Sequence, residues 1–290
     1  MNDWTIIKVL SWTTSYLKKY SIESPRLTGE ILLAHCLGIK RLDLYLQYDR
    51  PLHKNELSGF KLLIKRRIQN EPVAYITGEK GFFESDFEVS HDVLIPRPDT
   101  ETLVEQALKI LKTYQGLCRP MMILELGTGS GAIIVSLARA VPNNLYFASD
   151  ISLAALAIAK RNAEKIARDR IRFFAGSWFS PLGGNSRFDL IVSNPPYIPT
   201  ADIQGLESEI KEFEPMLALD GGTDGIDSYR SILKNAHNYL VPGGILLLEI
   251  GFDQKEIMQS ISGQYKEYEF IDFIRDLAGH NRVALIKKID

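Results

Sequence analysis

The sequence has little cysteine, almost no net charge and no long apolar run. Its 290 residues include only two cysteines, Cys36 and Cys118, which lie far apart and lack the spacing of metal ligands. A disulfide framework is therefore not expected, whereas a reducing cytoplasm is. The formal net charge of −2 gives no general attraction to nucleic acid or to an anionic membrane.

Membrane and metal signals are also missing from the pattern. No apolar run approaches the roughly 20 residues that span a bilayer. The first residues, Met1 to Trp4, lack the basic-then-apolar order of a signal peptide. No cluster of His, Cys and carboxylate residues suggests a metal. Hydrophobic residues make up 45% of the sequence, which is ample for a packed core. With these signals missing, we expect a cytoplasmic protein without a membrane contact or a metal.

The first quarter of the chain has a helical pattern. Apolar residues recur at helical spacing around Leu10 and Leu17 and again around Phe60 and Ile64. We expect a small all-helical domain over residues 1–71, with the basic run 65–67 on a solvated helix face. Residues 72–94 then alternate apolar and polar side chains, which predicts a β-hairpin linker.

Alternating strands and helices follow. Strands are expected at 122–126, 145–149, 171–174, 188–192 and 245–250, with two final strands at 268–274 and 282–287. This order predicts an α/β domain over residues 95–290 with a mostly parallel sheet. Asp99 or Thr100 is expected to cap the first helix of the domain.

The stretch Asn194-Pro195-Pro196-Tyr197 follows an apolar, β-branched run that reads as a buried strand. Open α/β sheets bind ligands at the carboxyl ends of their strands. The prolines stiffen the exit from the strand, and the Asn194 side chain offers one acceptor oxygen and two donor hydrogens. Such a loop suits a planar NH2 group, with Tyr197 as a flat packing surface.

A glycine-rich turn, Gly127-Thr128-Gly129-Ser130-Gly131, follows Glu125 at the end of the first predicted strand. This turn and Asp150 also satisfy the dinucleotide fingerprint, so a nicotinamide cofactor stays open. Glu125, however, would repel a pyrophosphate and suits a cationic ligand. S-adenosylmethionine carries two cationic groups and a ribose diol that Asp150 could bind.

Taken together, these motifs resemble those of class I S-adenosylmethionine-dependent methyltransferases. The stretches 72–78, 81–83, 94–101, 213–215 and 276–279 extend the likeness over nearly the whole chain, which closely resembles the peptide chain release factor glutamine N5-methyltransferase family. The resemblance implies a seven-stranded Rossmann-like sheet with a terminal antiparallel hairpin, and a helical domain that docks the release factor. It implies methylation of the glutamine in the Gly-Gly-Gln motif, with S-adenosylhomocysteine as the product of the cofactor.

Site residues follow from the motifs and the resemblance together. The candidate catalytic residues are Asn194, Pro195 and Tyr197. Cofactor binding is expected from Glu125, Gly127, Thr128, Gly129, Ser130, Gly131, Asp150, Ile151, Ser177, Trp178 and Asn194. Substrate binding is expected from Asn194, Pro195, Pro196, Tyr197, Phe83 and Glu214. At Ser177 the family commonly has an acidic residue that holds the adenine amine, so a contact from this hydroxyl group would be weaker.

Three other functions remain open. An adenine-N6 nucleic-acid methyltransferase would use the same NH2-binding loop, but the acidic balance of the catalytic half counts against direct nucleic-acid binding. A ribosomal-protein glutamine methyltransferase has a similar protein amide as its acceptor. A cofactor-binding sensor would bind S-adenosylmethionine without transferring the methyl group.

Overall fold

The computed structural model describes residues 4–114, 119–168 and 170–289, so Cys118 lies outside the described residues. The chain forms two compact units. The first comprises Met1–Glu79 with Glu207–Phe213, and the second comprises Lys80–Leu206 with Glu214–Asp290. No described helix is both long and apolar enough to cross a membrane.

The first unit is helical, as its apolar spacing predicts. Its helices are α1 (Ile6–Lys19), α2 (Pro25–Leu37), α3 (Asp43–Leu46), α4 (Lys54–Arg67), α5 (Val73–Thr77) and the inserted α9 (Ser208–Lys211). Leu10, Leu32 and Phe60 are among the buried side chains that α1, α2 and α4 contribute to one core. Gly38 ends α2 with φ of 64°, a conformation that favours glycine.

The basic run at the end of α4 is only partly solvated, so the prediction of a solvated face is wrong for Arg67. Lys65 is exposed, whereas Arg67 is buried. Its guanidinium group pairs with the Glu209 carboxylate of α9 and donates to the Glu71 carbonyl at 3.2 Å. These acceptors compensate the burial of its charge.

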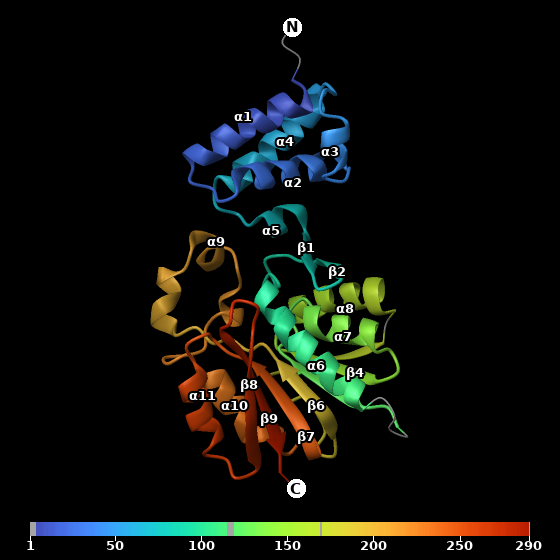
Figure 1. The fold of residues 1–290 in the computed structure, drawn as a ribbon, viewed down its shortest axis with the longest axis vertical. Helices are drawn as coiled ribbons and strands as arrows, with labels where there is room; N and C mark the ends of the chain where they lie inside the picture. Colours follow the sequence, from blue (N-terminus) through green and yellow to red (C-terminus); the bar gives the residue numbers. More distant parts are fainter. Residues whose placement is uncertain (1–3, 115–118, 169, 290) are drawn as a thin grey trace. The chain divides into compact units, whose positions relative to one another are not determined.

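The second unit is an α/β domain, drawn in green to red in Figure 1. Its helices are η1 (Pro98–Thr100), α6 (Glu101–Thr113), α7 (Ala132–Ala140), α8 (Leu153–Ala167), η2 (Thr200–Gly205), η3 (Met216–Ala218), α10 (Asp227–Ala236) and α11 (Lys255–Ser262). A separate hairpin of β1 (Glu79–Phe82) and β2 (Ser85–Glu88) precedes them. The hairpin was predicted from the alternation in residues 72–94, but residues 73–77 of that stretch form α5.

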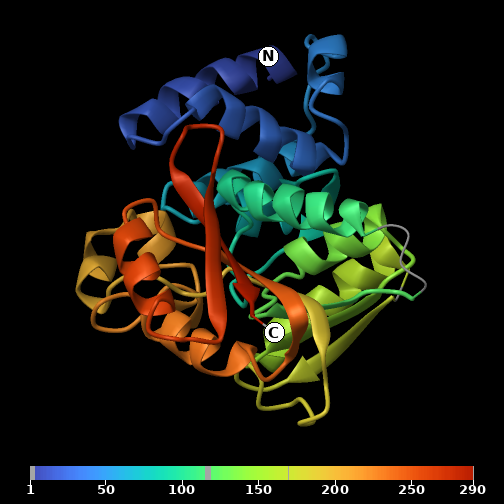
Figure 2. The same cartoon turned by 60° about the horizontal axis from the view of Figure 1, so that its bottom comes forward.

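The main sheet has seven strands in the order β5-β4-β3-β6-β7-β9-β8. Its strands are β3 (Met122–Leu126), β4 (Leu145–Asp150), β5 (Ile171–Ala175), β6 (Phe188–Ser193), β7 (Leu240–Glu249), β8 (Tyr268–Arg275) and β9 (Asn281–Lys288). Neighbours from β5 to β7 are parallel, whereas β9 is antiparallel to β7 and to β8. The red hairpin in Figure 2 is this β8–β9 pair. The predicted mostly parallel sheet with a terminal antiparallel hairpin is confirmed.

Helices cover both faces of the sheet. Ile123 of β3 faces a core that α6, α7 and α8 share, and the next residue, Leu124, faces the core of α10 and α11. Figure 1 shows these two groups of helices on opposite sides of the strands. Successive side chains of a strand point to opposite faces, so a strand buried on both sides must be apolar throughout. Polar groups at the strand ends therefore need another explanation.

Candidate active site

Four neighbouring parallel strands end beside one another with polar residues. The strands β4, β3, β6 and β7 are adjacent in that order. Glu125 lies near the end of β3, Asp150 ends β4, Asn194 follows β6 and Glu249 ends β7. Parallel strands bring their carboxyl ends to one edge, where open α/β sheets bind ligands. This edge contains a cavity of the second unit.

The glycine-rich turn between β3 and α7 forms one wall of this cavity. Gly127, Gly129 and Gly131 have φ of 67°, 55° and 81°, values that a residue with a Cβ rarely adopts. A Cβ at Gly131 would also lie 3.3 Å from the Cα of Ala159. The backbone of the turn can therefore approach a ligand closely, and α7 can pack against α8.

Asp150 supports the turn from the neighbouring strand. Its Oδ2 accepts the Gly129 N–H at 2.8 Å, and its Oδ1 accepts the Ser152 N–H at 2.9 Å. Burial raises the pKa of Asp150, while these backbone hydrogen bonds oppose that shift. The carboxylate thus orders the loop and also lines the cavity.

Glu125 faces the same turn, as predicted, but it is almost completely buried. Its Oε2 accepts hydrogen bonds from the Thr128 hydroxyl group and from the Ile134 N–H. Burial, the dominant cause, raises the pKa of Glu125 to about 8. The expectation of a fully charged carboxylate therefore needs correction, because at neutral pH the carboxyl group is mostly protonated until a cation approaches it.

The cavity has a volume of about 300 Å³, within the usual size of small-molecule sites. Predicted site residues in its wall are Glu125, Gly127, Thr128, Gly129, Ser130, Asp150, Ile151, Ser177, Trp178, Asn194 and Pro196. Other parts of the wall come from the segments around Leu94 and Arg97 and around Pro215 and Leu217.

Trp178 forms an aromatic side of the cavity. It is half-buried, and its ring carbon Cζ3 would lie 3.7 Å from a Cβ at Gly127. The Ser149 hydroxyl group donates to its carbonyl at 3.1 Å and fixes the backbone, which has φ of 49°. The exposed Ser177 and Ile151 lie in the same wall. A flat ring beside a glycine turn suits a planar heterocycle.

Asn194 reaches the cavity from the end of β6. Its Nδ2 donates to the Thr100 hydroxyl oxygen at 3.2 Å. Within the part of the chain that the structure describes, its Oδ1 accepts no hydrogen bond. Thr100 is the N-cap residue of α6, as expected, but its side chain makes no capping hydrogen bond. Its hydroxyl oxygen accepts from Asn194 instead.

The loop after Asn194 is held by Gln254. The side-chain NH2 of Gln254 donates to the Tyr197 carbonyl at 2.9 Å, and its Oε1 accepts from the Tyr229 hydroxyl group at 3.0 Å. A Cβ at Gly225 would lie 2.6 Å from the same carbonyl of Tyr197. Backbone segments thus pack directly on the loop and fix its path.

Five predicted site residues lie outside the described cavity wall. Gly131 packs on α8, and Pro195 is buried. The Tyr197 ring packs against the α10–α11 core, where burial raises its pKa to about 12. Phe83 packs against the other core, and the buried Glu214 binds the Ile95 N–H at 3.1 Å and the Arg97 guanidinium group. Direct ligand contacts from these residues stay predictions.

Three residues near the site were not predicted as site residues: Thr100, Glu249 and Gln254. Glu249 is almost completely buried, and within the described residues its Oε2 has no hydrogen-bond partner. A sequence signal did exist, because Glu249 interrupts an otherwise apolar strand pattern. A lone carboxylate at a strand end nevertheless does not reveal which loop it faces.

Comparison with known proteins defines the class first. Residues 103–210 match the methyltransferase small domain, and residues 8–78 match the PrmC N-terminal domain. A crystal structure of a methyltransferase from Pyrococcus furiosus superposes with a TM-score of 0.50 at 22% identity, covering 77% of this chain and 96% of that chain. At this identity the likeness shows the fold alone. Fold, family match and cavity together define a Rossmann-like methyltransferase.

Full-length relatives give the particular family. A release factor glutamine methyltransferase of Geobacter sulfurreducens is 45% identical over 97% of this chain and 96% of its own length. One from Rhodopirellula baltica is 37% identical over 98% and 97%. The chain belongs to the release factor glutamine methyltransferase family.

Proposed function

We propose that the protein transfers a methyl group from S-adenosylmethionine to the N5 amide nitrogen of the glutamine in the Gly-Gly-Gln motif of peptide chain release factors. The observation that carries the proposal is the side-chain oxygen of Asn194, which accepts no hydrogen bond from any residue that the structure describes, in a residue that lines the cavity beside the glycine turn. The chain belongs to a family of glutamine methyltransferases. The first unit would dock the release factor, as its match to the family's N-terminal domain suggests.

The cavity residues fit the cofactor. Three glycines with positive φ allow the backbone of the turn to approach the cofactor closely. Trp178 offers a flat surface for the adenine. Asp150 would bind the ribose hydroxyl groups, and Glu125 would face a cationic group. When bound, S-adenosylmethionine supplies an electrophilic methyl group on a sulfonium.

Asn194 and the proline loop would align the acceptor nitrogen. An amide nitrogen is a weak nucleophile because its lone pair is delocalised into the carbonyl group. If Asn194 Oδ1 and the Pro195 carbonyl each accept one N–H, the lone pair is directed at the methyl group. These hydrogen bonds strengthen as positive charge grows on the nitrogen, so they stabilise the transition state more than the ground state.

Mass spectrometry of the product tests the proposal. The purified protein is incubated with isotopically labelled S-adenosylmethionine and, in separate reactions, with a release factor, a ribosomal-protein mixture or DNA. We expect the label on the Gly-Gly-Gln glutamine. A release factor with Glu in place of that Gln is the matched control, since it lacks the NH2 group. Label on DNA or ribosomal protein alone, or cofactor binding without transfer, would overturn the proposal in favour of the corresponding alternative.

A further inference from the structure

Glu249 is a buried carboxyl group beside Asn194 for which the proposed mechanism has so far given no role. It ends β7 beside β6, and because Ser193 pairs with Leu248 in the register of the two strands, Glu249 lies next to Asn194. Burial raises the pKa of Glu249 to about 7, while hydrogen bonding from Thr100 and Asn194 opposes that rise. Glu249 is not among the residues of the described cavity wall, whereas its neighbours Thr100 and Asn194 are. An effect of Glu249 on the reaction can therefore pass through Thr100 or Asn194.

The hydrogen bonds among these three side chains can run in two directions. A hydroxyl group has a single hydrogen, and an ionised carboxylate only accepts. If the ionised carboxylate of Glu249 accepts the Thr100 O–H, the Thr100 oxygen must accept from Asn194. The observed donation from Asn194 Nδ2 to Thr100 at 3.2 Å has this direction, and it leaves Oδ1 of Asn194 for the cavity.

Protonation of Glu249 permits the reverse order. The carboxylic acid can donate to Thr100, whose O–H then donates to the Asn194 oxygen after a flip of the side-chain amide. The NH2 group of Asn194 would then face the cavity. Two NH2 groups offer each other only donors, so a substrate amide would lose its acceptor. In this scheme the charge on Glu249 would select which end of Asn194 faces the substrate.

We propose that Glu249 is a positioning residue that sets the direction of the hydrogen bonds through Thr100 and so turns the acceptor oxygen of Asn194 toward the incoming NH2 group. The proposal rests on the proposed function. It also gives a reason for the unpartnered Oε2 of Glu249, because unsatisfied buried polar atoms are rare in folded proteins and are retained mainly where function requires them.

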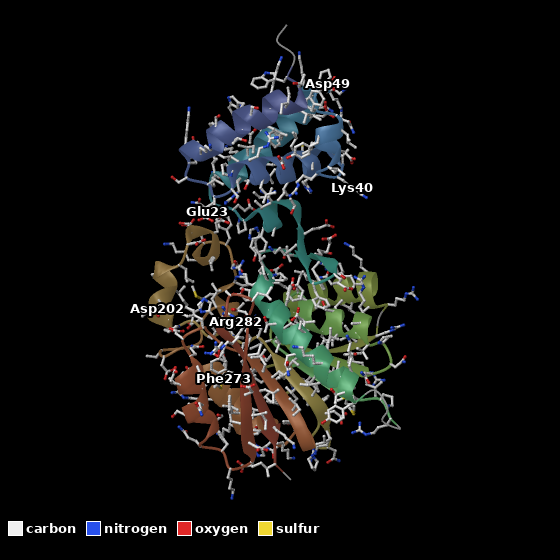
Figure 3. The ribbon with its side chains drawn as sticks, viewed as in Figure 1. Glu23, Lys40, Asp49, Asp202, Phe273 and Arg282 are labelled. Atoms are coloured by element: carbon white, nitrogen blue, oxygen red, sulfur yellow. The ribbon has the colours of Figure 1, made fainter. Side chains whose placement is uncertain are left out.

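The charged and titratable surroundings of Glu249 keep its charge adjustable. Arg282 of β9 lowers its pKa and Asp99 of η1 raises it, while burial dominates and brings the pKa to about 7. Tyr197 from the loop and Tyr229 of α10 also face it. Arg282, labelled in Figure 3, is itself paired with Asp99 at 2.9 Å, so its charge is shared and does not hold Glu249 fully ionised.

Turnover as a function of pH tests the proposal. In the wild type we expect kcat to rise with pH through an apparent pKa near 7, because the ionised form of Glu249 is the active one. Glu249→Gln, which can donate to Thr100 like the protonated acid, should lower kcat about 100-fold and abolish the rise, with the dissociation constant for S-adenosylmethionine unchanged. Thr100→Val, which lacks the hydroxyl group, should have the same two effects. Thr100→Ser, which keeps it, should retain the wild-type pH profile.

A matched control and a measurement without turnover separate the possible failures. Asp189→Asn alters a buried carboxylate at the opposite end of β6 and should leave the pH profile unchanged. The side-chain amide signal of Asn194 in 15N NMR should shift near pH 7 in the wild type but not in Glu249→Gln. A wild-type enzyme that methylates a different NH2 group refutes only the proposed function. An Asn194 signal that does not change between pH 6 and 8, or a Glu249→Gln variant with wild-type kcat and pH profile, overturns the positioning role even if the variant is less stable.

Discussion

Glu125 is the buried group whose ionisation we expect cofactor binding to change most. In the free protein burial raises its pKa to about 8, so at pH 7 it carries about 0.9 proton. A bound cation nearby favours the carboxylate and lowers this pKa. If the pKa returns to its ordinary value of 4.5, binding at pH 7 releases nearly the whole of that about 0.9 proton.

Isothermal titration calorimetry measures the release directly. The heat of S-adenosylmethionine binding is recorded at pH 7 in two buffers of different ionisation enthalpy, and the difference gives the number of protons. Glu125→Gln keeps an acceptor oxygen for the Thr128 hydroxyl group and cannot titrate. We expect the release by the wild type to exceed that of the variant by nearly one proton. The subtraction removes the cofactor's own amine from the comparison, and equal values for the two proteins would refute the role of Glu125.

The same pKa shift predicts a pH dependence of stability without cofactor. The folded-state pKa of Glu125 is raised above the unfolded value of 4.5, so the folded state binds more protons between pH 4.5 and about 8. The free energy of unfolding should therefore fall as pH rises through that window, by at most about 1.4 kcal/mol per pH unit. Urea unfolding at pH 5.5 and 7.5 should show this fall in the wild type relative to Glu125→Gln, since Glu249 contributes equally to both proteins. A constant difference between them would contradict the buried position.

Three further substitutions test separate parts of the site. Asn194→Ala should leave the cofactor dissociation constant within a small factor and raise the barrier of methyl transfer by about 2–4 kcal/mol; unchanged turnover would rule out its role. Trp178→Ala should weaken cofactor binding by about 1 kcal/mol, measured by calorimetry, and no change would place the adenine elsewhere. Gly131→Ala should lower the free energy of unfolding by about 1–2 kcal/mol because of its positive φ and the contact with Ala159. Its control, Gly184→Ala, has open space around the Cβ and should change the unfolding energy by less than about 0.5 kcal/mol.

Periodicity predicted the helices and strands well because burial is a local property of the pattern. The alternation of Ile123 and Leu124 between two cores and the apolar stripe of α6 follow from residue type alone. Arg67 shows where this reasoning ends. Its burial depends on Glu209, which lies far away in the sequence, so no window around α4 could reveal it.

The site was predictable to the extent that backbone geometry requires particular residues. Gly127, Gly129 and Gly131 have the positive φ values for which glycine is the usual choice, and Asn194 lies at a strand end, where ligands bind. The environment of a side chain was not predictable. Glu125 was taken as a charge, yet its burial favours the neutral form. Thr100 occupies the predicted N-cap position of α6, but its hydroxyl group contacts Asn194 and makes no capping hydrogen bond.

The carboxyl edge of the sheet has one electrostatic property that explains these details together. Asp150, Glu125 and Glu249 lie at or near the carboxyl ends of β4, β3 and β7, and burial raises the pKa of each carboxyl group. Each of them therefore gains from a positive charge nearby, either a cationic ligand or a nitrogen that becomes positive during methyl transfer. An anionic ligand such as a pyrophosphate would instead raise these pKa values further and force the groups to remain protonated. The edge of the sheet thus favours positive charge, which counts against the dinucleotide alternative despite its matching glycine spacing.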